Sequence, residues 1–319
     1  MQYTRNMVTG ASTADLALIL IDARHGVVEQ TKRHAFLAAL LGIPHLVVCV
    51  NKMDLVGYAE ETFDAIARDF CALRASLGVK DVTFIPISAL RGDNVVDRSA
   101  AMDWYGGLPL LEHLESVEVA ADRNLDDVRF PIQWVIRDHD ADYRGYAGQV
   151  AGGVLHPGDP VTVQPSGVRT TIASIDTVDG PLGEAFPPMS VTVRLADDVD
   201  ASRGDVLTGG SRDARVEREL EADVCWMAEQ PLRPGARLAV KQAASSARVI
   251  VDGLLDRLDV ATLDRETGPA ELALNDIGRV RLRTSRPLVF DAYEDNRATG
   301  SFILIDEGTN ETVAAGMIR

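Results

Sequence analysis

The feature that most constrains this chain is a change of pattern near residue 127. Before it, strand-like apolar runs alternate with helical segments. Leu16–Asp22 reads LALILID, a continuous apolar run typical of a parallel strand buried on both faces. A helical stretch over Val28–Leu41 follows and stops at Gly42-Ile43-Pro44. Strand–helix–strand order with short links predicts a parallel sheet covered by helices on both faces.

The same alternation continues up to the change of pattern. An amphipathic helix is predicted where Phe63, Ile66, Phe70, Leu73 and Leu77 recur at spacings of three and four, with Gly78 closing it. Two further strands and a last short helix, opened by Pro109, complete the segment. The two strands are His45–Val50 and Val82–Ile87.

After a charged linker at Asn124–Arg129, short alternating strands and turn sequences replace the helices. One set of strands ends near Gly210, and a second runs from about Ala222 to a hairpin that pairs Ser301–Asp306 with Thr312–Met317. The first set is Pro131–Ile136, Val161–Gln164, Thr170–Ile175 and Ser190–Leu195. We therefore expect an α/β domain over 1–127, then two all-β barrels over 128–212 and 213–319.

Charge and hydropathy exclude several classes of protein. The net charge is −16 and the pI about 4.8, so the surface repels phosphate backbones and a nucleic-acid partner is not expected. No run approaches the roughly 18–20 apolar residues of a membrane span. The opening sequence MQYTRNMVTG lacks the profile of a secretory signal. We expect a cytoplasmic protein without a membrane partner.

Cysteine and histidine usage predicts no metal site. Cys49, Cys71 and Cys225 lie far apart, and no two of the six histidines have metal-ligand spacing. Cys49 falls in an apolar strand and Cys71 on a helix, so both are predicted to be small core residues. Neither a disulfide framework nor a zinc site is expected.

The sequence Asn51-Lys52-Met53-Asp54 follows a buried strand, at the sheet edge where open α/β folds bind ligands. A carboxylate at Asp54 can accept hydrogen bonds from the ring N–H and the exocyclic amine of guanine, whereas adenine offers no matching pair. Asn51 can bridge neighbouring loops and contact the base, and the Lys52 stem can lie along the base face. Taken alone, the four residues are equally well explained as a polar turn.

A second motif decides between these two interpretations. Ser88-Ala89-Leu90 follows the next strand after one intervening helix, so its backbone N–H groups can reach the guanine carbonyl. Strand, NKMD, helix, strand and SAL in this order are rarely supplied by chance. The predicted guanine-binding residues are therefore Asn51, Lys52, Asp54, Ser88, Ala89 and Leu90.

The arrangement resembles GTPases of the elongation-factor type, and the resemblance implies that the α/β domain over 1–127 is a partial P-loop GTPase-type, GTP-binding domain. More narrowly, QYTRNMVTGASTADLALILIDARHGVVEQTKRH, NKMDLV, NRATGSFILID and the final AAGMI resemble the large GTPase subunit of bacterial sulfate adenylyltransferase. The resemblance implies GTP as cofactor, with Mg²⁺ in the complete family members. It also implies a small catalytic subunit as partner, which makes adenylyl sulfate from ATP and sulfate while GTP hydrolysis drives the reaction.

One part of that family pattern is missing from the 319 residues. No G-x-x-x-x-G-K-S/T string occurs, and the magnesium hydroxyl, the first switch and the Asp-x-x-Gly-His motif are absent too. We interpret the chain as N-terminally truncated and assign no catalytic residue. We expect an apolar sheet edge beside Leu16–Asp22, and we predict that these residues alone do not hydrolyse GTP.

Two other functions stay open: a fragment of a translation factor that delivers aminoacyl-tRNA, and a non-enzymatic scaffold for the catalytic subunit. Three smaller features complete the predictions. Gly145 and Gly148, in a barrel loop with Arg144, are predicted to permit close backbone approach. Arg297, Thr299 and Gly300 are assigned either to the partner contact or to a turn before the last hairpin. The carboxylates of the linker are predicted to be solvated, and these are Asp122, Asp126 and Asp127.

Overall fold

The computed structural model describes residues 14–77, 81–118, 124–138, 143–259, 262 and 264–319. The chain divides into two compact units. The first comprises residues 1–122 and 259–264, and the second comprises 123–258 and 265–319. Each is taken by itself below. Residues 1–13, which include the opening sequence MQYTRNMVTG, the closing Gly78 and Asp122 lie outside the described residues.

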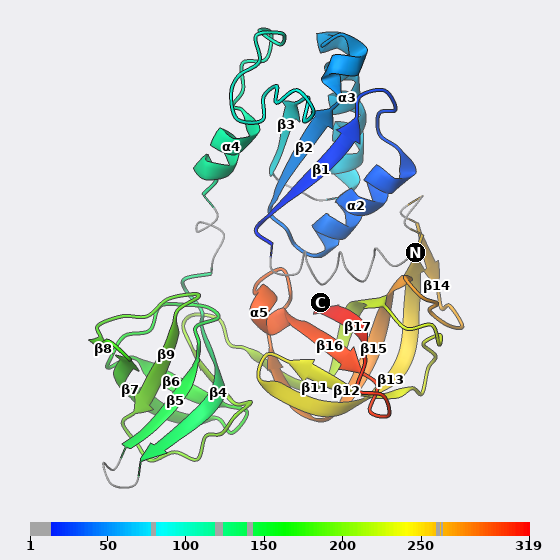
Figure 1. Ribbon diagram of the computed structural model, residues 1–319. Helices are drawn as coiled ribbons and strands as arrows, with labels where there is room; N and C mark the ends of the chain where they lie inside the picture. Colours follow the sequence, from blue (N-terminus) through cyan, green and yellow to red (C-terminus); the bar gives the residue numbers. More distant parts are fainter. Residues whose placement is uncertain (1–13, 78–80, 119–123, 139–142, 260–261, 263) are drawn as a thin grey trace. The chain divides into compact units, whose positions relative to one another are not determined.

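The first unit is built on a parallel sheet, as predicted, in the order β1-β2-β3 (Figure 1). Leu16 of β1 is paired with His45 of β2, and His45 in turn with Asp81 of β3, so the three strands start level and end together. The strands are β1 (Leu16–Asp22), β2 (His45–Asn51) and β3 (Asp81–Pro86). Because their carboxyl ends meet at one edge, the loops that follow β1, β2 and β3 lie side by side there.

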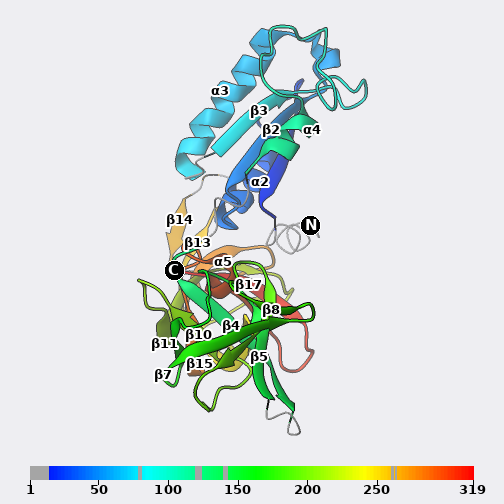
Figure 2. The same cartoon turned by 90° about the vertical axis from the view of Figure 1, so that its left-hand side faces the viewer.

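Helices and loops cover both faces of the central strand, whose residues Leu46–Val50 are all buried. On one face, Phe84 of β3 packs edge-on against Phe70, with ring centroids 5.8 Å apart. On the other face, Cys49 and Ile85 pack against Leu110. Figure 2 shows α3 and α4 on opposite sides of the sheet. The helices are α2 (Glu29–Leu40), the short 3₁₀ helix η1 (Met53–Val56), α3 (Glu60–Leu77) and α4 (Leu110–Ser116).

Strand β1 ends the sheet within the described part of the chain, and one of its faces is open. Leu18 and Leu20 are 42% and 60% exposed, although their register partners Val47 and Cys49 are buried. The predicted apolar edge beside Leu16–Asp22 is therefore present in the described residues.

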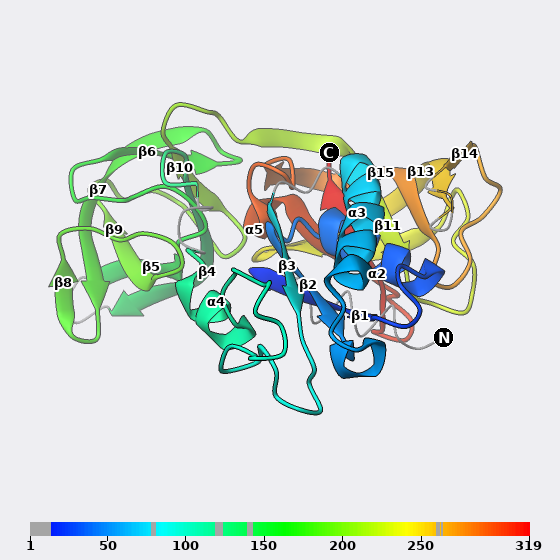
Figure 3. The same cartoon turned by 90° about the horizontal axis from the view of Figure 1, so that it is seen from above.

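The second unit begins with a six-stranded antiparallel barrel. Its strands follow the order β6-β10-β4-β5-β9-β7-β8, and pairing of β6 with β7 closes the ring, leaving β8 outside it beside β7 (Figure 3). Closure leaves no free edge in the ring. The strands are β4 (Val128–Asp138), β5 (Tyr143–Gln149), β6 (Pro160–Gln164), β7 (Val168–Thr177), β8 (Gly180–Leu182), β9 (Ser190–Leu195) and β10 (Val206–Gly209).

A second barrel of the same design follows. Its order is β12-β16-β17-β11-β15-β13-β14, and β12 pairs with β13 to close the ring. The predicted final hairpin is confirmed as β16 paired with β17. The elements are β11 (Arg215–Trp226), β12 (Arg237–Gln242), β13 (Ser245–Leu258), β14 (Arg265–Thr267), β15 (Ile277–Phe290), α5 (Arg297–Gly300), β16 (Ser301–Ile305) and β17 (Thr312–Ile318). The predicted fold class, an α/β sheet followed by two barrels, is confirmed.

Two glycines of the first barrel serve close approach, as predicted. A Cβ at Gly148 would lie 2.4 Å from the carbonyl oxygen of Pro131, a backbone atom that cannot move aside. At Gly145 it would lie 2.5 Å from the Thr192 methyl group. Any other residue at Gly148 would force neighbouring strands apart, whereas at Gly145 the Thr192 and Tyr143 side chains would have to shift.

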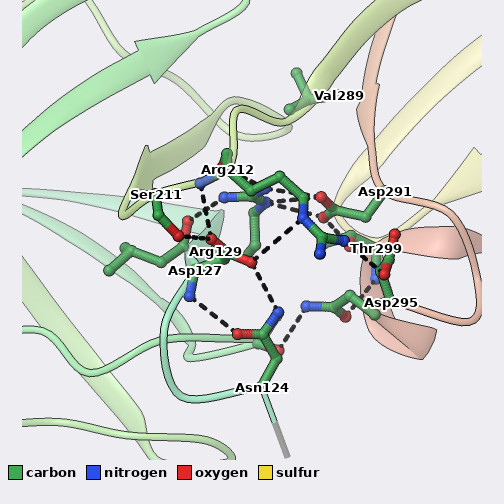
Figure 4. Close-up of polar contacts among 12 residues, drawn as sticks. Asn124, Asp127, Arg129, Ser211, Arg212, Val289, Asp291, Asp295 and Thr299 are labelled. Carbon is green, nitrogen blue, oxygen red and sulfur yellow. Dashed lines mark hydrogen bonds and ion pairs between the residues drawn. The ribbon is translucent and has the colours of Figure 1, made fainter.

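The barrels are tied together by a buried ion pair that the sequence did not suggest (Figure 4). Arg129 of β4 donates from Nε and Nη2 to both carboxylate oxygens of Asp291 at 2.9 and 2.8 Å, and the two side chains are 1% and 7% exposed. Thr299 Oγ1 donates to the same carboxylate at 2.6 Å. Thr299 and Gly300 are buried in α5, directly before the last hairpin, so they are not surface contacts. Arg297 is half-buried, and its contact with a partner stays a prediction.

The prediction that the linker carboxylates are solvated is wrong for Asp127. Its side chain is buried and accepts hydrogen bonds from the Arg212 N–H at 2.9 Å and from Asn124 Nδ2 at 3.0 Å (Figure 4). Burial alone would raise the pKa of Asp127, but these bonds and the nearby Arg129 guanidinium outweigh it, so the pKa is lowered.

The prediction for the cysteines is half right. Cys49 and Cys225 are buried, whereas Cys71 is exposed, because it lies on the solvent side of α3 one residue after the core residue Phe70. Within the described ranges, no cluster of histidine, cysteine and acidic residues could hold a metal ion. None of the helices in those ranges is both long and apolar enough to cross a membrane.

Candidate functional site

The residues after β2 form a strained turn at the carboxyl edge of the sheet. Lys52 has a φ of 67°, in the left-handed region that non-glycine residues rarely adopt. Met53 anchors the turn, since its side chain is fully buried and its N–H donates to Ile87 O at 3.2 Å. Asp54 follows in the 3₁₀ helix η1. The strained backbone directs the Asn51, Lys52 and Asp54 side chains along the end of the sheet.

Asn51 links the two predicted motifs. Its Oδ1 accepts a hydrogen bond from its neighbour Lys52 N–H at 2.7 Å and from Ala89 N–H, on the following loop, at 3.0 Å. Two backbone donors on one amide oxygen orient the side chain, and its Nδ2 is left to contact a ligand. The predicted bridging of neighbouring loops by Asn51 is confirmed.

Ser88 and Asp54 are joined directly. Ser88 is fully buried, and its Oγ donates to Asp54 Oδ1 at 2.7 Å. Within the described residues, Asp54 Oδ2 accepts no hydrogen bond. One carboxylate oxygen is therefore held in place by the protein, while the other can accept from a ligand.

The backbone of the loop that carries Ser88 is held by residues that sequence reasoning missed. Ser88 N–H donates to Asp93 O at 3.1 Å, which closes the loop on itself. The Asp93 carboxylate accepts from Tyr58 Oη and Ser99 Oγ, both at 2.8 Å. The hydrogen bond to Asp93 raises the pKa of Tyr58. Tyr58 lies just after the first motif, so it couples the two loops, and no local sequence signal marks that contact.

Asp22 at the end of β1 is a second residue that sequence reasoning did not select. Its carboxylate accepts from Arg24 Nη2 at 2.6 Å and from Lys52 Nζ at 2.8 Å. These bonds, that of Arg24 first, hold the pKa of Asp22 well below its ordinary value. The signal was available: in a parallel sheet, the residue that ends β1 must lie beside the residue that ends β2, here Asn51.

Ala89 and Leu90 sit at the rim. Leu90 is 86% exposed, and Leu55 across the site is 56% exposed. The Ala89 N–H is bonded to Asn51, while in the described part of the chain the Leu90 N–H has no hydrogen bond. Of the predicted backbone donors, Leu90 N–H is therefore the one free to meet a carbonyl group.

Taken together, the site presents a carboxylate acceptor, an amide and a backbone N–H beside two exposed apolar side chains. Such a set recognises the edge and face of a planar heterocycle that carries two adjacent donors. The 319 residues contain no G-x-x-x-x-G-K-S/T string that could cradle phosphates. The geometry of the described residues accordingly fits the base of a nucleotide.

Comparison with known proteins also indicates a nucleotide-binding domain in the first unit. Residues 1–121 match the family model for the elongation factor Tu GTP binding domain. Residues 219–319 match that for the GTP-eEF1A C-terminal domain. The crystal structure of Sup35 complexed with GMPPNP aligns with 97% of this chain and 79% of its own, with a TM-score of 0.58 and 28% identity.

Similarity over essentially the whole of this chain is found with longer curated proteins. The chain is 56% identical over its whole length to the bifunctional enzyme CysN/CysC of Mycobacterium tuberculosis, of which it covers 52%. It is 47% identical to sulfate adenylyltransferase subunit 1 of Bacteroides thetaiotaomicron, over 99% of this chain and 67% of the relative. The chain thus spans about half the length of the first of these relatives and two thirds of the second.

Proposed function

Since the chain belongs to the family of sulfate adenylyltransferase subunit 1, we propose that it is a GTP-binding regulatory subunit of such an enzyme. In this role it couples GTP hydrolysis to the formation of adenylyl sulfate from ATP and sulfate. The observation that carries the proposal is the convergence of Asn51, Asp54 and Ser88, which hydrogen bonds tie into one acceptor site. The described residues supply the base-recognising part of the nucleotide site.

Selectivity for guanine rests on Asp54. Its carboxylate meets the two donors on the guanine edge, N1–H and the exocyclic amine, and Leu90 N–H faces the guanine carbonyl. Adenine would leave the carboxylate without donors, at a cost of about 1.5–3 kcal/mol for each bond lost. Lys52 and Leu90 flank the base, and their apolar atoms cover its faces.

The phosphates and Mg²⁺ require groups outside this set. Phosphoryl transfer depends on positioning and charge stabilisation around the transferred phosphate. The contacts to the base are equal in the ground state and the transition state, so they do not lower the chemical barrier. We therefore expect these 319 residues to select guanine and to leave the rate of GTP hydrolysis at background, with or without Mg²⁺.

The partner we propose is the small catalytic subunit of sulfate adenylyltransferase. Both barrels close their own hydrogen bonding and are linked by the buried Arg129–Asp291 pair, so they offer a preformed surface. The same observation favours the second candidate function, a scaffold that holds the catalytic subunit without hydrolysing GTP. Co-purification with the small subunit from the same genome tests the partner. Separation of the two at low salt would contradict it.

Titration calorimetry tests base recognition. We expect the chain to bind GDP more tightly than ADP, and Asp54→Ala to abolish the difference. Asp69→Asn, on the exposed side of α3, is a matched control that removes an acidic charge from the same unit. Equal binding of GDP and ADP by the unaltered chain would refute the proposed function.

A further inference from the structure

A pocket of about 470 Å³ opens at one end of the first barrel, in the unit that does not carry the guanine site. Three arginines line it from three strands: Arg137 on β4, Arg144 on β5 and Arg194 on β9. Arg137 and Arg144 are direct cross-strand partners. Like charges opposite each other destabilise a sheet, so this pairing calls for a compensating anion.

The protein supplies hydrogen-bond acceptors to only some of the nitrogen atoms of the Arg144 guanidinium. Its Nη1 pairs with Asp198, and its guanidinium lies 5.5 Å from the centre of the Tyr146 ring. Its Nε and Nη2 are buried without a hydrogen bond to any described residue, although Asp200 Oδ1 forms a long ion pair with Nη2 at 3.8 Å. Buried donors without acceptors are rare and costly in folded proteins.

The other two guanidinium groups are also open to a ligand. Arg194 stacks on the Tyr143 ring at 5.0 Å, and Tyr143 Oη donates to Asp176 at 3.0 Å, which fixes the stack. In the described part of the chain, neither Arg137 nor Arg194 is paired with a carboxylate. Stacking orients a guanidinium while leaving its N–H edge available for an anion.

Acidic side chains also border the pocket, and their contacts decide whether an anion can enter. Asp197 is engaged by Thr170 Oγ1 at 2.8 Å, and Asp138 has a partner of its own. Asp198, which holds Arg144, is 88% exposed. An exposed carboxylate is held weakly to its partner, so it can move into solvent and release Nη1, which together with the unbonded Nη2 forms a fork of donors.

We propose that this pocket binds a tetrahedral oxyanion, phosphate or sulfate, which displaces the Asp198 carboxylate from Arg144. Arg144 takes two oxygens through its fork, and Arg137 and Arg194 neutralise the remaining charge. The pocket is larger than a bare oxyanion requires, so the anion is either free or carried by a mononucleotide.

Calorimetry on the full chain in chloride buffer, with sulfate, inorganic phosphate and AMP as separate ligands, tests the proposal. Arg144→Gln is expected to weaken binding about tenfold, because it removes a charge-assisted bidentate contact. Asp198→Asn is expected to tighten binding about threefold, because it removes the competing carboxylate. Asp179→Asn, which removes an equal charge at the exposed turn before β8, should change nothing.

If sulfate or phosphate binds and AMP does not, the ligand of the pocket is a free oxyanion. If only AMP binds, the ligand is an oxyanion carried by a nucleotide. Asp198 is exposed, so its variant keeps the fold even where an Arg144 variant does not. The proposal is overturned when none of the three ligands binds, or when Asp198→Asn leaves affinity unchanged or lowers it.

Discussion

Ser88 and Asp54 lie 34 residues apart, yet their side chains meet at the end of the sheet, where Ser88 Oγ donates to Asp54 Oδ1 at 2.7 Å. The bond fixes the orientation of the Asp54 carboxylate, so that its other oxygen can accept hydrogen bonds from a ligand. Ser88→Ala removes it while the alanine still fits the buried position. Affinity for GDP should fall by about 1–2 kcal/mol, a factor of about 5 to 30.

Calorimetry on the Ser88→Ala variant measures this effect, with Ser116→Ala on α4 as a control that deletes an exposed hydroxyl from the same unit. Ser88 Oγ also accepts a longer hydrogen bond from Arg91 N–H at 3.3 Å, but that N–H keeps its bond to Ser88 O at 3.1 Å, so thermal unfolding should change little. GDP affinity equal to that of the unaltered chain would show that Ser88 does not position the base acceptor.

The Asp22 carboxylate predicts a pH dependence for the first unit. Arg24 and Lys52 lower the pKa of Asp22 below its ordinary value of 3.8. A carboxyl group whose pKa is depressed in the folded state contributes stability above its unfolded pKa and loses it as the pH falls. The free energy of unfolding should therefore exceed that of Asp22→Asn by a constant amount above pH about 5, and the gap should narrow below pH about 4.

Urea unfolding of both proteins between neutral and acidic pH measures that gap. Asp69→Asn, whose exposed side chain makes no comparable ion pair, should show no such convergence with the unaltered chain. If the difference in free energy of unfolding between the unaltered chain and Asp22→Asn widens as the pH falls, the prediction is wrong.

The Arg129–Asp291 pair predicts a strong, non-additive effect on the barrels. Both side chains are almost fully buried, so Asp291→Ala leaves an uncompensated guanidinium and should cost about 3–5 kcal/mol of unfolding free energy. Removing both charges, as in Arg129→Met with Asp291→Leu, should cost clearly less. Urea unfolding followed by the fluorescence of the buried Trp226 reports the loss. A cost for the double variant equal to the sum of the costs of Arg129→Met and Asp291→Leu would show that the two side chains do not interact.

Much of the fold was predictable because its signals are local. The Leu16–Asp22 run and the spacing of Phe63, Ile66 and Phe70 specify a strand and a helix from neighbouring residues alone. Turn sequences likewise separated the barrel strands. Cys71 shows the limit of this reasoning, since helical periodicity fixes burial only when the buried side of the helix is known.

The candidate site was predictable only in part. Asn51 and Asp54 follow a strand in a recognisable motif, so their place at the sheet edge could be foreseen. The contact between Tyr58 and Asp93 could not be foreseen, because the Tyr58 hydroxyl donates to a carboxylate 35 residues away, on another loop. The same reason explains the error at Asp127, whose partner Arg212 comes from the far end of the first barrel. Contacts between distant loops depend on the finished fold.

The most direct test of the central claim, that Asp54 selects guanine, exchanges the acceptor for an amide. Asp54→Asn presents a donor where guanine carries its amine, so the variant should prefer xanthine, which has a carbonyl group there. Binding of GDP and xanthosine diphosphate to both proteins should show a reversal of preference, with a loss of about tenfold or more for GDP. If Asp54→Asn binds GDP as tightly as the unaltered chain and gains nothing for xanthosine diphosphate, then Asp54 does not read the base.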